Sequence, residues 1–165
     1  MNNIKNILKI ALLLIAFTSF TACDEGGDPD QEATTTGRFA GDWWVDISDS
    51  DGNVLIPHAL MTTVNTAAND NTMWINDEEH EGLMKCKMTI DPATGTFSAT
   101  DSENLLTKDP STVNITEGLV SFGTGVSKGG HVVNSIQFKV EFSEEPGVIY
   151  TFKGTQWTGF LEDEY

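Results

Sequence analysis

The stretch Ile136-Gln137-Phe138-Lys139-Val140-Glu141-Phe142-Ser143 alternates apolar and polar residues without a break. A β-strand places successive side chains on opposite faces, so this pattern predicts a strand with one face buried and the other in water. The stretch Met84-Lys85-Cys86-Lys87-Met88-Thr89-Ile90-Asp91 repeats it, and shorter alternations run through 43–48, 97–100 and 150–153. No stretch after the first 22 residues shows the period of an amphipathic helix. The chain is therefore predicted to be all-β.

Short turn sequences separate the predicted strands. Asp, Pro and Gly, which favour tight hairpin turns, occur in Asp49-Ser50-Asp51-Gly52-Asn53, Asp91-Pro92-Ala93-Thr94-Gly95 and Glu144-Glu145-Pro146-Gly147. We expect Gly154 to permit a bulge in the last strand before Trp157. Eight strands are expected, at residues 41–48, 54–65, 72–76, 84–91, 96–101, 112–122, 131–143 and 148–158.

Sequential strands joined by hairpins predict an antiparallel meander. Eight such strands can close into a barrel, which has no free edges and can enclose one small ligand. A two-sheet β-sandwich fits the same pattern and is the alternative fold. A chain of 165 residues is long enough for one compact domain, which we place at residues 38–165.

Residues 1–22 have the features of a lipoprotein signal peptide. Lys5 and Lys9 precede an apolar run that is too short to span a bilayer as a helix. The phrase Phe20-Thr21-Ala22-Cys23 resembles the lipobox of bacterial lipoproteins, in which the cysteine is acylated and becomes the first residue. We therefore expect Cys23 to carry a lipid anchor. The alternative is an ordinary cleaved signal peptide with a chance cysteine.

Residues 23–37 are acidic and lack aromatic side chains, which predicts a flexible tether between the anchor and the domain. The expected location is the cell envelope, at the periplasmic or surface side of the outer membrane. The whole chain has 25 Asp and Glu against 9 Lys and Arg, a formal net charge of −16. This charge argues against nucleic acid as a partner, because there is no basic surface to displace phosphate counterions.

The domain also resembles a known protein family. The resemblance lies in Gly41-Asp42-Trp43-Trp44-Val45, Thr63-Val64-Asn65-Thr66-Ala67, Met73-Trp74-Ile75-Asn76-Asp77 and the distinctive closing phrase Trp157-Thr158-Gly159-Phe160-Leu161-Glu162-Asp163-Glu164-Tyr165. These elements are similar to the lipid-binding putative hydrolase family of Gram-negative lipoproteins and span most of 38–165. The resemblance implies a lipocalin-like, calycin-type barrel that binds lipid. It brings no catalytic motif that maps onto this chain.

The alternation points a flexible and aromatic set of side chains toward the inner face of the barrel. Thioethers and aromatic rings adapt well to irregular apolar ligands. They can equally fill a solid core, because every half-buried strand needs an apolar face. The candidate ligand-binding residues are Trp43, Met84, Met88, Phe97, Phe138, Phe142 and Phe152.

A possible nucleophile lies in Gly125-Val126-Ser127-Lys128-Gly129, which matches the G-x-S-x-G pattern of hydrolases. That pattern requires a strand-to-helix turn, whereas another strand follows here. The only histidine further along is His131, four residues on, which disfavours a catalytic triad. A glycine-rich hairpin loop explains these residues equally well. Cys86, among inward positions, is expected to be an inert buried thiol.

No strong metal site and no cofactor are expected. His80 lies within Asp77-Glu78-Glu79-His80-Glu81, which can ligate a cation, but a run of carboxylates is more often a solvated turn. Asp49, Asp51 and Asn53 suggest calcium, but the glycine spacing fails the EF-hand loop.

Three hypotheses of function follow. The leading one is a lipid-anchored envelope protein that binds a small apolar or amphipathic ligand, such as a lipid, inside the barrel. The second is a non-catalytic accessory protein that contacts envelope proteins or glycans through its loops, with Trp44 and Trp74 as the exposed residues to inspect. The third is an esterase that uses Ser127.

Overall fold

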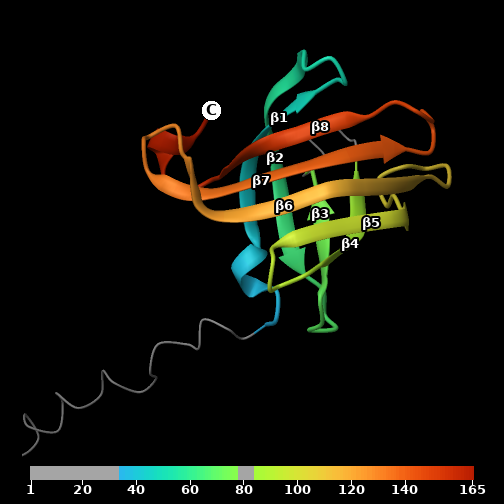
Figure 1. Ribbon diagram of the computed structural model, residues 1–165, viewed down its shortest axis with the longest axis horizontal. Coiled ribbons are helices and arrows are strands. Elements are labelled where there is room, and N and C mark those ends of the chain that lie inside the picture. Colours follow the sequence, from blue (N-terminus) through green and yellow to red (C-terminus); the bar gives the residue numbers. More distant parts are fainter. Residues whose placement is uncertain (1–33, 78–83) are drawn as a thin grey trace, which may run out of the picture. The chain divides into compact units, whose positions relative to one another are not determined.

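The computed structural model of this chain describes residues 34–77 and 84–165. It shows a closed barrel of eight antiparallel strands in sequence order (Figure 1), so the predicted fold is confirmed and the sandwich alternative is not. The strands are β1 (Gly41–Ser48), β2 (Val54–Asn65), β3 (Thr72–Asn76), β4 (Lys85–Ile90), β5 (Thr96–Glu103), β6 (Thr112–Val126), β7 (Val132–Phe142) and β8 (Tyr150–Gln156). Two 3-10 helices, η1 (Gly37–Phe39) and η2 (Leu161–Asp163), flank them.

The predicted signal peptide at 1–22, the anchor residue Cys23, most of the predicted tether and His80 lie outside the described residues. The described domain is one compact unit, Thr34–Tyr165. Within it, no helix is both long enough and apolar enough to cross a bilayer.

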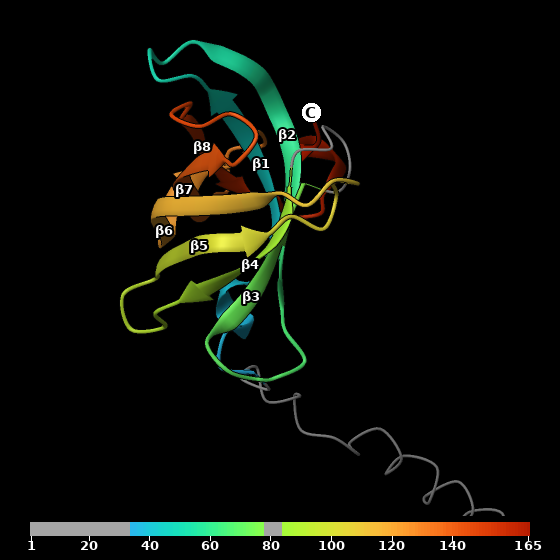
Figure 2. The same cartoon turned by 90° about the vertical axis from the view of Figure 1, so that its right-hand side faces the viewer.

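The barrel is flattened, and its strands run in two main directions. Figures 1 and 2 show β1–β3 crossing the direction of β5–β8 at a steep angle. Because each strand runs antiparallel to the one before it, the connections between strands lie at the two rims of the barrel. The N-terminal rim carries residues 34–40, 66–71, 91–95, 127–131 and 157–165, and the described part of the distal rim carries 49–53, 104–111 and 143–149.

The core lies inside the barrel and is built by the alternation in the sequence. In β4, and in β7 from Ile136 onward, every second residue is buried, and Lys87 on β4 is exposed. Met84 and Cys86 are fully buried. The hydrophobic core therefore takes one face of every strand, as the pattern predicts.

Gly154 does not form the expected bulge, so that expectation is wrong. It pairs with Val45 on β1 and Ile136 on β7, and the register on both sides of β8 runs without a shift. A Cβ atom at this position would overlap the carbonyl oxygen of Trp44. The glycine is thus needed because β1 lies unusually close to β8 where the barrel closes.

The bulges lie elsewhere, and β6 carries two of them. Its register against β7 shifts between Thr116 and Leu119, where Glu117 has a φ of 53°, and again between Ser121 and Gly125. These bulges bend β6 and let it continue to Val126, beyond the end predicted from the sequence.

The η1 helix closes the N-terminal rim. Phe39 is fully buried in the core, and its carbonyl oxygen accepts a hydrogen bond from the Thr63 hydroxyl at 2.7 Å. The same hydroxyl accepts the indole N–H of Trp43 at 2.9 Å. One buried hydroxyl on β2 thus satisfies two polar groups that the core would otherwise leave without partners.

Candidate functional site

One wall of the barrel interior is rich in sulfur. Met73 on β3 lies opposite Met88 on β4, and Met61 on β2 lies opposite Trp43. Methionine is unbranched and polarisable, so these side chains can rearrange at low cost. We call this set the methionine wall; it comprises Met61, Met73, Met84, Cys86 and Met88, each 2% exposed or less.

The strands β5, β7 and β8 contribute aromatic rings to the interior. Phe138 stacks on Phe152 with ring centroids 4.8 Å apart, and Phe97 lies 5.6 Å from Phe138 in a tilted arrangement. We call these three residues the phenylalanine cluster. Phe142 lies four residues beyond Phe138 on β7, nearer the distal rim, and its ring centroid is 6.0 Å from that of Tyr150.

The interior is filled by these side chains. A side chain that lined a water-sized space would keep accessible surface, yet the inward residues keep almost none. The structure therefore brings all seven candidate residues into one packed interior, in which the described side chains leave no ready-made ligand cavity. Their exposures run from zero to 8% across Trp43, Met84, Met88, Phe97, Phe138, Phe142 and Phe152.

In the described part of the distal rim, apolar side chains continue from the interior toward solvent. Ile56 and Tyr150 are partly buried and pack against the core, while Val54 and Val148 beyond them are 53% and 42% exposed. The Tyr150 hydroxyl donates a hydrogen bond to Glu145 at 2.7 Å, which raises the pKa of the phenol. An apolar path with a polar group at its outer end is the arrangement that an amphipathic ligand requires.

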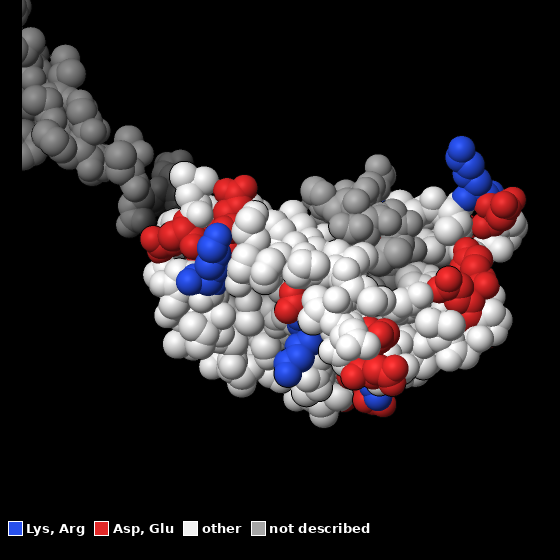
Figure 3. All heavy atoms as spheres, turned by 90° about the horizontal axis from the view of Figure 1, so that it is seen from above, with Lys and Arg blue, Asp and Glu red and all other residues white. Residues whose placement is uncertain are grey.

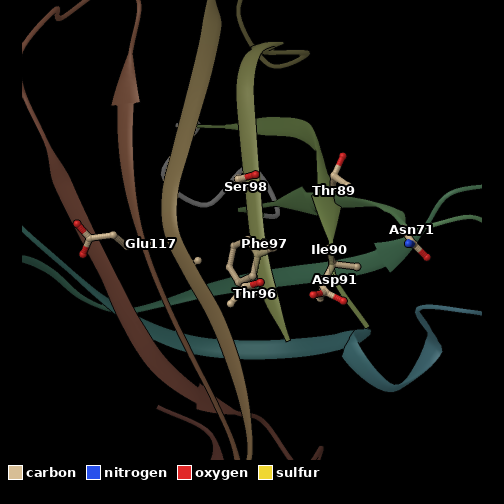
Figure 4. Close-up of a pocket in the computed structure, with 9 residues that line it drawn as sticks. Asn71, Thr89, Ile90, Asp91, Thr96, Phe97, Ser98 and Glu117 are labelled. Atoms are coloured by element: carbon tan, nitrogen blue, oxygen red, sulfur yellow. The ribbon is translucent and has the colours of Figure 1, made fainter. Parts of the chain in front are cut away.

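A shallow hollow of about 480 Å³ lies over the hairpin of β4 and β5 (Figure 4). Thr89 and Ser98 face each other across the two strands there. In Figure 4 Glu117 points away from Phe97, and its carboxylate is held by Lys139 at 2.7 Å. The lining is about equally polar and apolar and the hollow is open to solvent, so it does not enclose an acyl chain.

Ser127, the candidate nucleophile, is buried at the β6–β7 turn. Its hydroxyl accepts the backbone N–H of His131 at 3.1 Å and donates to the carboxylate of Asp163. Asp163 also accepts the Gly129 amide and the Thr158 hydroxyl. Burial raises the pKa of Asp163, but these hydrogen bonds outweigh burial and lower it.

The His131 ring is not hydrogen-bonded to Ser127. Its Nε2 atom lies 2.6 Å from a Glu162 carboxylate oxygen, and this hydrogen bond raises the pKa of the imidazole. Serine and imidazole are thus engaged with two different acids of the tail. The arrangement attaches residues 157–165 to the barrel. The roles of Asp163 and Glu162 are not predicted by the sequence pattern, in which the acidic closing phrase is the one signal that includes them.

Cys86 is buried in the methionine wall. Burial raises the pKa of its thiol to about 12, against a smaller lowering by a hydrogen bond with Ser102. At neutral pH the group is therefore a protonated thiol rather than a nucleophilic thiolate.

Trp44 and Trp74 both point to the outer face. Trp44 packs against Trp157 and Tyr165, with ring centroids 5.9 and 5.7 Å away, and is half-buried by them. Trp74 lies under the ammonium group of Lys87 at 5.2 Å. Across β2 the two are opposite Leu60 and Val64 respectively, about 13 Å apart along the strand. They therefore share a face without forming one aromatic patch.

Of the candidate metal ligands, His80 lies outside the described residues, and Asp49 is engaged within its own turn. No group of three His, Cys, Asp or Glu suited to a metal ion occurs in 34–77 and 84–165. The Asp49 side chain accepts the amides of Asp51 and Asn53 at 2.9 Å each, so it stabilises the hairpin turn. His58 stacks on Tyr165 with ring centroids 3.7 Å apart.

The charge on the surface is uneven. On the face shown in Figure 3, acidic side chains gather in groups and much of the surface between them is uncharged.

Comparison with known proteins gives one match. A family model described as lipid-binding putative hydrolase matches residues 28–161, which is most of the chain. No curated protein matches the sequence significantly.

Proposed function

Because the chain belongs to the lipid-binding putative hydrolase family, we propose that it is an envelope lipoprotein that binds an apolar or amphipathic small molecule inside its barrel. Family membership and the barrel fold support lipid binding in general. The finer part of the proposal is the position of the ligand, between the methionine wall and the phenylalanine cluster.

The observation that carries this proposal is the concentration of sulfur side chains on adjacent strands. Met73 and Met88 are directly opposed on β3 and β4, and Met61 lies on the neighbouring β2. A branched aliphatic core would be rigid, whereas thioether side chains can change rotamer and make room for an acyl chain. The ligand would then replace side-chain contacts with its own, gaining about 25 cal/mol for each Å² of apolar surface buried.

The route we propose runs through the distal rim. Phe39 is fully buried at the opposite rim, whereas Ile56 and Tyr150 at the distal rim are only partly buried. An amphipathic ligand would place its chain along the phenylalanine cluster and its polar end near the Tyr150 hydroxyl.

The membrane attachment is proposed from the sequence. Acylation of Cys23 would hold the protein to the outer membrane, on its periplasmic or surface side. Each buried methylene adds about 0.8 kcal/mol, and stable anchoring requires more than one acyl chain.

Refolding in the presence of fatty acids and detergents, followed by native mass spectrometry, tests the ligand proposal. We expect one retained ligand per chain. In the triple variant Met73→Leu, Met84→Leu and Met88→Leu, volume is conserved but flexibility is reduced, so retention should fall. Ile75→Leu, at a buried position on β3 near Met73, is the matched control and should retain the ligand. No retained ligand in the wild type, or equal retention in the triple variant, would contradict the proposal.

The packed interior keeps a second function open, that of an accessory protein that contacts glycans or other envelope proteins. Trp74 is the residue that favours it, because its ring lies on the outer face beside Lys87. On this alternative, Trp74→Ala abolishes binding to an envelope glycan array and leaves lipid retention unchanged. Loss of lipid retention alone in the methionine variants would exclude it.

A further inference from the structure

The ribbon formed by β6 and β7 continues past the N-terminal rim and carries apolar side chains into solvent. On β7, Val132 lies on the same face as Ile136, which follows it by four residues. Ile136 is 2% exposed inside the barrel, whereas Val132 is 74% exposed. Val126 lies opposite Val132 and is 63% exposed. The inner face of the barrel thus extends outward as an uncovered apolar surface.

The C-terminal tail places two more large apolar side chains beside this ribbon. Phe160 and Leu161 are 62% and 86% exposed, and the Phe160 ring lies 6.4 Å from the His131 ring. Figure 1 shows the tail next to the end of the ribbon. Because Asp163 ties the tail to Gly129, these side chains are held in place rather than free to fold inward. We call Val126, Val132, Phe160 and Leu161 the docking surface.

The charge of the ribbon differs from that of the rest of the chain. Residues 118–140 contain no Asp or Glu, although the chain has 25 of them, and they contain Lys128, His131 and Lys139. The Arg38 guanidinium lies 4.2 Å above the Phe122 ring on the same ribbon. Of the acids in the tail, Asp163 is buried against Gly129, Glu162 is paired with His131, and Glu164 is exposed. An exposed apolar surface beside a ribbon segment that carries no acids suits the interface of a bilayer with zwitterionic lipids.

The point at which the chain enters the domain, at Thr34, indicates that a membrane covers the docking surface. The chain enters the barrel at the N-terminal rim, the rim from which the ribbon projects. Cys23 precedes Thr34 by a segment that can span at most about 40 Å. We propose that the docking surface inserts into the headgroup region of the bilayer to which the chain is anchored. This proximity rests on the proposed acylation of Cys23, whereas the affinity of the surface for lipid does not.

The test uses the chain from residue 23 with Cys23→Ser, so that no acyl chain contributes to binding. Its partition onto phosphatidylcholine vesicles is measured by flotation for three forms. The first form carries no further change, the second carries Val132→Asp and Leu161→Asp, and the third carries Leu55→Asp and Leu105→Asp at the distal rim as a matched control. Leu55 and Leu105 are also about half exposed, so both pairs of substitutions should leave the core intact.

We expect the docking-surface variant to partition at least about tenfold more weakly than the other two forms. Equal partition of all three forms, no partition of the first, or an equal loss in the distal control would each overturn the proposal. A concentration-dependent dimer that the docking-surface variant abolishes would also overturn it, by assigning the surface to a second copy. The mass of the acylated Cys23 peptide from cells tests the anchor separately, and ligand retention tests the proposed function.

Discussion

The Asp163 carboxylate accepts the backbone amide of Gly129 at 2.5 Å, although the two residues lie far apart in the sequence. Hydroxyl groups of Ser127 and Thr158 donate to the same carboxylate. Asp163 is 1% exposed, so this cluster is shielded from water. One acid therefore holds the C-terminal tail against the β6–β7 turn and, with it, the apolar side chains of Phe160 and Leu161.

Replacement of this acid should release the tail. In Asp163→Asn the amide loses the charge that strengthens the three hydrogen bonds, so the melting temperature should fall and amides in 158–165 should exchange faster. Glu164→Gln is the matched control, one residue away and exposed, and should change neither quantity. Identical exchange in the two variants would show that Asp163 does not hold the tail.

The stability of the tail should depend on pH in two separate ranges. The hydrogen bond that the His131 ring makes to the Glu162 carboxylate raises the pKa of His131 above its ordinary value of 6.5. A raised pKa means that the pair stabilises the folded state fully below pH 6.5 and loses this contribution as pH rises through the folded pKa. Asp163 has a lowered pKa, so its contribution is present above pH 3.8 and is lost as pH falls through the folded value.

NMR titration of the His131 ring measures the first of these ranges directly. Its midpoint should lie above 6.5 in the wild type and move back toward 6.5 in Glu162→Gln. A midpoint that does not respond to the loss of Glu162 would rule out this pair as the cause of the shift.

The hydrogen bonds of the Thr63 hydroxyl should contribute more to the free energy of unfolding than the packing of the side chain does. Thr63→Val preserves the shape but leaves the Trp43 indole N–H and the Phe39 carbonyl without their buried partner, which should cost about 2 kcal/mol of unfolding free energy. Thr63→Ser keeps the hydroxyl and should lose less. Urea unfolding compares them, and a smaller loss in Thr63→Val than in Thr63→Ser would mean that packing of the methyl group, not hydrogen bonding, stabilises this position.

Ser127 should act in structure rather than in catalysis. Its hydroxyl is hydrogen-bonded to Asp163, and the His131 ring is hydrogen-bonded to Glu162. Hydrolysis of p-nitrophenyl esters should therefore run at the same background rate in the wild type and Ser127→Ala, while the variant melts at a lower temperature. A wild-type rate well above background that disappears in Ser127→Ala would assign an esterase to this site.

The strand pattern could be predicted because it depends on neighbours in the sequence. Alternation around Met84 and Phe138 states which side chains share a face, and the first three strands begin and end as predicted, at 41–48, 54–65 and 72–76. Strands joined in order by short turns leave few topologies other than a meander. The closed barrel could therefore be predicted from local sequence patterns.

The rest depends on contacts between distant residues. The role of Gly154 is set by the Trp44 carbonyl of another strand, and the partners of Asp163 lie across the β6–β7 turn. Whether the barrel is hollow or filled depends on the summed volumes of side chains such as Trp43, which alternation does not report. These features could not be read from the period of the sequence.

The most direct test of the account is to locate a bound ligand by its contacts with methionine methyl groups. The protein would be labelled with carbon-13 at the methionine methyls, refolded with a fatty acid, and studied by nuclear Overhauser spectroscopy. The account predicts contacts from the acyl chain to Met73, Met84 and Met88, which are fully or almost fully buried inside the barrel. Contacts confined to surface residues such as Val132 and Leu161, with none to these three methyls, would contradict binding inside the barrel.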